Sequence, residues 1–203
     1  MGGLLGYRYV RLRSRHGEAG SLREALRTEV EPRLGAWNAQ TWGCWQGIFG
    51  LHSRDLLVMI SHPTRPVRPL RELTDLLATQ ADVLEQRAFL PTVRPADSAP
   101  LTRKGFYVHR TFDVDAGNVD RVAALSREAW ENFEHSDRYA SRPEGLFREP
   151  ADVQSGQMLL ITWYETMDAW QASRDFHPAA LANFRKRAAL TTGTLAIATQ
   201  LLP

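Results

Sequence analysis

The alternation of apolar and polar residues predicts the same order of elements in each half of the chain: strand, helix, strand, strand, helix, strand. In the first half, Leu22, Leu26, Val30 and Leu34 are four residues apart, which places them on one face of a helix. The expected strands are 6–13, 42–51, 56–62 and 87–94, and the expected helices are 19–37 and 70–84.

The second half repeats this order. Strands are expected over 106–114, 145–149, 157–164 and 194–201, and helices over 118–135, 167–174 and 179–190. The segment between the halves, 95–104, contains two prolines and has no apolar periodicity, so it is predicted to be a linker. The expected units are therefore 1–94 and 105–203.

Short motifs recur between the halves. Gly47-Ile48-Phe49 and Gly145-Leu146-Phe147 lie 98 positions apart, and Gly6-Tyr7 and Gly105-Phe106 lie 99 apart. We interpret these collinear matches as a tandem duplication.

The repeated pattern predicts an α+β fold. The order βαββαβ is that of the ferredoxin-like motif, whose helices cover one face of an antiparallel sheet and leave the other face in need of a partner. We therefore expect two tandem ferredoxin-like units whose antiparallel sheets pack into one intrachain pseudo-dimeric α/β barrel. A ligand would then bind in the cavity between the sheets.

Composition narrows the function. The 203 residues are 43% apolar, and no run approaches the ~18–20 apolar residues of a membrane span. The start, MGGLLGYRYVRLR, has no signal-peptide pattern, and the only cysteine, Cys44, fits a reducing cytoplasm. A net charge of +2 without a basic cluster argues against a nucleic-acid partner. We expect a cytoplasmic protein with no membrane partner.

The end of the strand 157–164 and the helix after it carry a family likeness. Ile161-Thr162-Trp163-Tyr164-Glu165 followed by Asp168-Ala169-Trp170 resembles the strand-to-helix signature of the dimeric α/β-barrel superfamily, most of all its antibiotic biosynthesis monooxygenase (ABM) and NIPSNAP branches. The resemblance implies several chemistries: cofactor-free oxygenation of phenolic or anthrone-like polyketides, haem degradation, other haem-based reactions, and cyclase or lyase steps. The fold alone does not determine which of these reactions a member catalyses.

The resemblance also bears on cofactors. Haem-degrading members carry a ligand histidine in the second helix, where the alignment places Leu181 in this chain, and His177 is the nearest imidazole. Their first-strand asparagine is not evident. This favours an enzyme without a cofactor, with haem held by His177 or His109 as the alternative.

Strand 106–114 supplies the predicted catalytic residues. Phe106, Val108, Phe112 and Val114 share one face, expected under the helices, while Tyr107, His109, Thr111 and Asp113 share the other, expected to face the cavity. The ordinary pKa of histidine lies near neutrality, so His109 can take a proton from a phenol, and Tyr107 can orient the phenolate. A buried polar cluster is the alternative.

At an offset of 99, the matching residues in the first half are Arg8, Val10 and Leu12, so the polar face is expected in the second half only. This favours a site in the second half.

Other residues are candidates for substrate binding. Thr111 shares the face of His109. Trp45 and Phe49 alternate along one strand and suit a flat aromatic ligand, with core packing as the alternative. Asn132 and His135 are three residues apart on a helix and can rim the cavity, with solvent exposure as the alternative.

The spacing of the six histidines fits no metal-binding motif, and the chain has no GxGxxG or P-loop pattern. We expect no metal. The predicted function is a cofactor-independent monooxygenase that oxidises a phenolic or polyketide-like aromatic metabolite. The alternatives are a non-catalytic barrel that binds haem or a hydrophobic ligand, and a haem-dependent enzyme. The expected assembly is a monomeric pseudo-dimer or a homodimer, and the expected partner is a small aromatic or hydrophobic substrate.

Overall fold

The computed structural model describes residues 5–63, 75, 77–134, 140–151, 153, 156–174 and 178–203. The chain divides into two units. The first comprises Met1–Leu90, Asp97–Arg103 and Thr199–Pro203, and the second comprises Pro91–Ala96 and Lys104–Ala198. Backbone hydrogen bonds explain why short segments belong to a different unit from their neighbours in sequence. Thr92 N donates to Leu146 O (2.9 Å) in the second unit, and Leu202 N donates to Cys44 O (2.8 Å) in the first.

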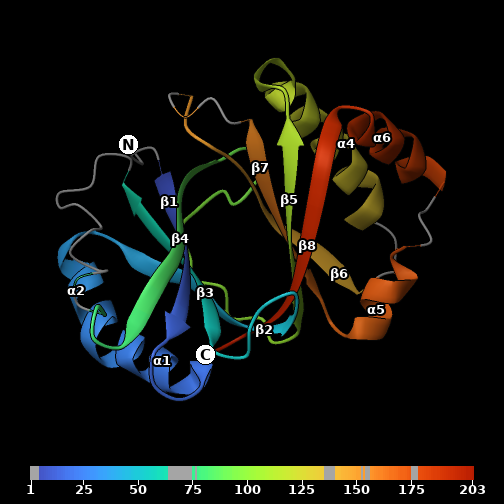
Figure 1. Cartoon of the computed structure of the whole chain (residues 1–203). Helices are drawn as coiled ribbons and strands as arrows, with labels where there is room; N and C mark the ends of the chain where they lie inside the picture. The colour runs from blue at the N-terminus through green and yellow to red at the C-terminus, as the bar shows by residue number, and fades with distance from the viewer. Residues whose placement is uncertain are drawn as a thin grey trace. The chain divides into compact units, whose positions relative to one another are not determined.

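The first unit contains an antiparallel sheet in the order β4–β1–β3–β2. Its strands are β1 (Leu5–Ser14), β2 (Gln40–Phe49), β3 (Asp55–Pro63) and β4 (Ala81–Pro91). The predicted helix 19–37 is confirmed as α1 (Ala19–Ala25), a π-helical turn (Leu26–Val30) and α2 (Glu31–Ala36) in succession (Figure 1).

The core of the first unit lies between this helix and the sheet. Leu22, Leu26 and Leu34 are buried with Val10 and Val58, so the four-residue spacing does mark the buried face of the helix. Cys44 belongs to the same cluster, and burial raises the pKa of its thiol to about 12. The cysteine is a packed core residue.

The predicted helix 70–84 was wrong at its C-terminal end. Residues 70–74 and 76 lie outside the described residues, but β4 begins at Ala81, six residues before the predicted start of the strand. Ala81 pairs with Ser14 and Val83 with Leu12 in the β1–β4 ladder. Leu84 is 44% exposed, so it does not extend a buried helical stripe. Pairing with β1 outweighs the local helical pattern here.

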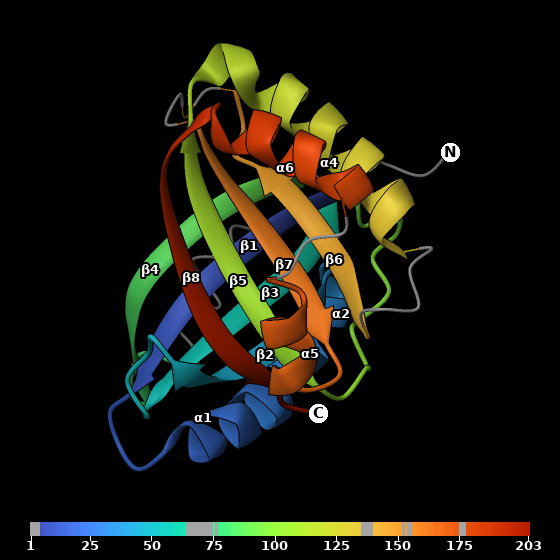
Figure 2. The same ribbon diagram turned by 90° about the vertical axis from the view of Figure 1, so that its right-hand side faces the viewer.

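The second unit has its strands in the order β8–β5–β7–β6, with β5–β7 and β6–β7 antiparallel. The strands are β5 (Phe106–Val114), β6 (Ser141–Arg148), β7 (Gln157–Tyr164) and β8 (Thr191–Leu201). A 3₁₀ turn (Ala116–Asn118) precedes α4 (Val119–Glu134), and α5 (Met167–Ala172) and α6 (Pro178–Ala188) follow β7. Figure 2 shows α4 and α6 side by side across one face of these strands.

The strand-to-helix junction forms as the sequence predicts. Thr166 is the N-cap of α5, and its Oγ1 accepts a hydrogen bond from Ala169 N (3.1 Å). The predicted faces of β5 are also confirmed. Phe112 packs with Val122 of α4, and Phe106 packs with Trp170 of α5.

The predicted correspondence between the halves was one residue out of register in the first strand. Val10 and Leu12 face α1 and α2, as Phe112 faces α4, so they do not match His109 and Thr111. The offset between corresponding residues of β1 and β5 is therefore 100. The residues of β1 that correspond to Tyr107, His109 and Thr111 are Tyr7, Tyr9 and Arg11. A shift of one residue moves every side chain of a strand to the other face. The polar face is therefore present in both units.

The glycine motif was also matched wrongly. A bulge precedes both Gly43 and Gly145, and an added Cβ would meet the ring of Trp45 at 2.2 Å or of Phe147 at 2.4 Å. Gly43–Trp45 therefore corresponds to Gly145–Phe147, at an offset of 102. The predicted partner Phe49 is instead 60% exposed.

Candidate functional site

The two predicted catalytic residues lie on the face of the second sheet opposite its helices. Tyr107 and His109 are 0% and 1% exposed. Burial lowers the pKa of His109 to about 3, so the imidazole is neutral and only weakly basic at neutral pH. The role of His109 as a general base stays a prediction.

The other predicted residues are scattered. Thr111 is partly buried on the same strand face as His109. Trp45 is buried in the first unit, where it contacts Trp42 with ring centroids 6.2 Å apart, and Phe49 is exposed. The side chain of Asn132, and His135 and His177 as a whole, lie outside the described residues.

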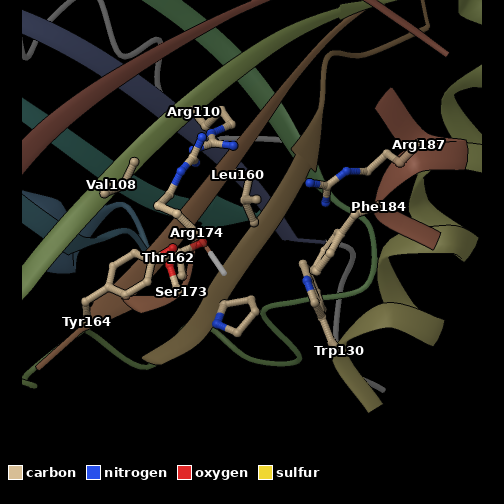
Figure 3. A pocket seen from close by; sticks show the side chains of 11 residues that line it. Val108, Arg110, Trp130, Leu160, Thr162, Tyr164, Ser173, Arg174, Phe184 and Arg187 are labelled. Carbon is tan, nitrogen blue, oxygen red and sulfur yellow. The ribbon is translucent and has the colours of Figure 1, made fainter. Parts of the chain in front are cut away.

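A pocket lies on the other face of the second sheet, between the strands and the helices (Figure 3). Its cavity volume is about 70 Å³. The lining residues come from β5, β6, β7, α4, α6 and the segment after α5: Val108, Arg110, Trp130, Pro143, Leu160, Thr162, Tyr164, Ser173, Arg174, Phe184 and Arg187.

Strand alternation places the polar groups of this pocket. Arg110 lies between Val108 and Phe112 on the helix-facing side of β5, and it pairs with Leu160 of β7. Thr162 and Tyr164 follow Leu160 at intervals of two and therefore share its face. Figure 3 shows Arg110 entering from the strands and Arg187 from α6.

Arg187 is held between aromatic rings. Its guanidinium carbon lies 5.1 Å from the ring centroid of Phe184 and 5.6 Å from that of Phe112. Its Nη1 donates to Ser126 Oγ (3.4 Å). Burial, with repulsion from Arg110, lowers the pKa of Arg187 to about 10. The group is therefore a charged guanidinium at neutral pH.

Three guanidiniums meet at this pocket. Burial lowers the pKa of Arg110, and Arg174 lowers it further. Among the described residues, no carboxylate forms an ion pair with Arg110, Arg174 or Arg187. Tyr164 is the described group that acts to raise the pKa values of Arg110 and Arg187, against the effect of burial. Arg174 is exposed and lies over the ring of Trp170, whereas Arg110 and Arg187 are partly buried. Charges removed from water are stable in proteins when they are paired, so Arg110 and Arg187 favour an anion.

Hydroxyl groups complete the polar lining. Thr162, Tyr164 and Ser173 are all buried, and Ser173 Oγ donates to Trp170 O (2.7 Å). Burial raises the pKa of Tyr164, although its hydrogen bond with Ser173 and the nearby guanidiniums act in the opposite direction. The phenol therefore remains neutral and can donate a hydrogen bond.

The first unit has an arginine on this face of β1, Arg8, whose pKa burial also lowers, but it lies one step of two residues away and corresponds to Val108. At the offset of 100, the residue that corresponds to Arg110 is Val10, which is part of the apolar core. The residue that corresponds to Tyr164, at the offset of 102, is His62. The sequence did contain a signal for this site, namely an arginine within an otherwise apolar strand face.

A larger cavity of about 380 Å³ lies in the first unit, at the end of β3. Its lining includes Ser61, His62 and Gln40 and contains no charged side chain among the described residues. His62 Nδ1 lies 2.6 Å from Pro63 O, so this nitrogen carries the proton and Nε2 is an acceptor.

The sequence matches no protein-family model and no curated protein. Solved structures do resemble the fold. A provisionally assigned monooxygenase from Fusobacterium nucleatum superposes with a TM-score of 0.64 at 9% identity, over 100% of this chain and 94% of that one. An anthrone oxidase-like protein gives a TM-score of 0.59 at 14% identity, over 98% and 92%. Chlorite dismutase from Candidatus Nitrospira defluvii, in complex with imidazole, gives 0.60 at 8% identity, over 98% and 91%.

The likeness shows that this chain shares the α+β fold of these proteins. No helix among the described residues is long and apolar enough to cross a membrane.

The pocket does not fit haem. Its cavity volume of about 70 Å³ lies far below the ~300–1,000 Å³ of pockets that bind larger ligands, and its described lining offers no imidazole. His109 points to the opposite face of the sheet. We therefore derive no step through haem.

Proposed function

We propose that this protein is a cofactor-independent monooxygenase that oxidises a phenolic or polyketide-like aromatic metabolite, bound at the arginine-lined pocket of the second unit. The observation that carries the proposal is the group of three guanidiniums without a described carboxylate partner, beside Trp130 and Phe184. The fold likeness to provisionally assigned monooxygenases and to an anthrone oxidase-like protein supports the reaction class.

The arginines supply the electrostatic part of the mechanism. A positive charge within about 4–6 Å lowers the pKa of a bound phenol, so the substrate ionises at neutral pH. The resulting phenolate is electron-rich and transfers electrons to dioxygen. Arg110 and Arg187 would hold the anion in place, and the aromatic lining would exclude water.

The substrate supplies the reducing power in this scheme. For an anthrone-like methylene group, two C–H bonds break and one carbon–oxygen double bond forms. One atom of dioxygen enters the product as the carbonyl oxygen, and the other leaves as water with the two hydrogens. No external reductant is needed.

Tyr107 and His109 remain proposed catalytic residues for a substrate on the opposite sheet face, with Thr111 beside them. The helix-side pocket is preferred because the pKa of His109, about 3, makes it a weak acceptor of a phenol proton. A non-catalytic barrel that binds a hydrophobic ligand is the second candidate.

Family resemblance and fold likeness also support a proposal about the whole chain. We propose that the two units arose by tandem duplication and that the protein is an ABM-like pseudo-dimer whose sheets close one barrel. The cytoplasm is the proposed location.

Oxygen uptake with a hydroxylated anthrone or naphthol as substrate tests the function. The wild type should consume about one equivalent of oxygen without releasing hydrogen peroxide. Arg187→Gln should lower kcat/KM about 100-fold, as expected when a charged stabilising group is lost. Arg185→Gln, an exposed arginine on the same helix, is the matched control and should leave the rate unchanged. Binding without oxygen uptake would favour the non-catalytic protein.

A further inference from the structure

We infer that the pocket of the second unit is a subsite for an acid group, a carboxylate or a phosphate, which the aromatic substrate carries in addition to its phenol. The inference rests on the proposed function, because it assigns a second group on the same substrate. It goes further in naming what Arg110 and Arg187 recognise.

The first argument is that several guanidiniums share one pocket. Three guanidiniums line the pocket, and no described carboxylate pairs with them. A phenolate and a carboxylate each carry one negative charge, but a phenolate presents that charge on a single oxygen. A carboxylate or phosphate presents several oxygens, and it matches the forked N–H donors of arginine with two parallel hydrogen bonds.

The second argument is the number of unused donors. A guanidinium has five N–H donors, and the described acceptor for Arg187 is Ser126 Oγ alone. Phe112 and Phe184 contact its guanidinium as cation–π partners and accept no conventional hydrogen bond. The remaining donors are available to a ligand in the pocket, as is the hydroxyl lining of Thr162 and Tyr164.

The third argument is size. A cavity volume of about 70 Å³ is roughly half of a ~150 Å³ cavity that binds benzene. It can hold a carboxylate or phosphate group but not a ring system. The rings of the substrate must therefore lie outside this cavity.

Calorimetric titration under nitrogen tests the inference without turnover. The probes are 2-naphthoate, 2-naphthyl phosphate and 2-naphthol, which share a ring system and differ in the acid group. At least one of the two anions should bind ten times or more tighter than 2-naphthol. Tighter binding of the naphthoate would identify a carboxylate substrate, and tighter binding of the phosphate would identify a phosphate ester. Equal binding of all three probes, or no binding of either anion, would overturn the inference.

Substitutions of the arginines test whether the anion binds in this pocket. Arg187→Gln and Arg110→Met should each weaken binding of the preferred anion at least tenfold, and Arg185→Gln should not. Circular dichroism and the Tm confirm that each variant is folded, and Arg110→Met replaces Arg187→Gln if the latter does not fold. Unchanged affinity in the folded variants would overturn the inference.

The two proposals fail in different ways. Anion binding without oxygen uptake on the hydroxylated anthrone or on 2-naphthol removes the oxygenase and leaves the subsite. Oxygen uptake with 2-naphthol that neither anion inhibits removes the subsite and leaves the oxygenase.

Discussion

His109 and Arg110 are consecutive residues of β5, and their side chains lie on opposite faces of the second unit's sheet. His109 is 1% exposed and points away from the helices, whereas Arg110 enters the pocket beneath them. The strand therefore separates a buried neutral imidazole from a charged pocket. A proton-transfer site at His109 and an anion site at Arg110 are distinct hypotheses, and single substitutions can separate them.

Arg110→Met should make the protein more stable and less active. The substitution replaces a partly desolvated charge by an apolar side chain, and the corresponding residue of the first unit is the buried Val10. Replacing buried charges by packed apolar residues is neutral or stabilising by about 1–4 kcal/mol. We expect a rise in Tm of about 2–4 °C, measured by calorimetry, together with weaker substrate binding. A lower Tm would show that Arg110 serves packing.

His109 should make the free energy of unfolding decrease as the pH falls. Its pKa is about 3 in the folded protein and 6.5 as the ordinary value, so below pH 6.5 the unfolded state binds a proton that the folded state does not. Stability is therefore present above pH 6.5 and is lost as the pH falls, by up to about 1.4 kcal/mol per pH unit. Urea unfolding between pH 7 and 4 should show a smaller slope for His109→Gln, provided that variant is folded. Equal slopes would contradict the assignment.

Asp55 should contribute strongly to the folding stability of the first unit. It is 0% exposed and accepts hydrogen bonds from Arg11 Nη2 (2.6 Å) and Arg13 Nε (2.7 Å). Burial acts to raise the pKa of Asp55, but the hydrogen bonds from Arg13 and Arg11 outweigh it and hold the pKa below its usual range.

Asp55→Asn should therefore lower the free energy of unfolding by about 3 kcal/mol, because it leaves two arginines without their carboxylate. Chemical denaturation measures this loss. Since the folded pKa is lowered, the contribution is present at neutral pH and is lost only in acid. Asp82→Asn is a suitable control, because Arg15 and Asp82 form an exposed pair worth at most about 1 kcal/mol. Equal effects of the two substitutions would contradict the assignment.

Gly145→Ala should destabilise the second unit. The added Cβ would meet the ring of the buried Phe147 at 2.4 Å, so the ring must move within a packed core. Overpacking of this kind costs about 1–3 kcal/mol. Gly117→Ala is the control, because no atom lies within 4 Å of its added Cβ. Thermal unfolding of the two variants compares them directly, and an unchanged Tm for Gly145→Ala would contradict the packing described.

Local patterns predicted the elements well where one face is buried. The stripe from Leu22 to Leu34 gave the first helix, and the alternation in 106–114 gave both the bounds and the faces of β5. The prediction was wrong at residues 81–84, because pairing of β4 with β1 is a long-range interaction that a local pattern does not contain.

The pocket was harder to predict. Its lining joins Arg110, Tyr164 and Arg187, which come from three elements separated by up to 77 positions. Polar alternation instead drew attention to Tyr107 and His109 on the opposite face. Arg110 was visible as an arginine among apolar neighbours, but its meaning depended on Arg187 and on the lack of a described carboxylate beside them.

The most direct test of the central claim is a crystal structure of the protein with 2-naphthoate, or with 2-naphthyl phosphate if that anion binds more tightly. The account predicts that oxygens of the acid group lie about 2.7–2.9 Å from guanidinium nitrogens of Arg110 and Arg187, on the helix-covered face of the second sheet. A ligand bound instead beside Tyr107 and His109 would contradict it.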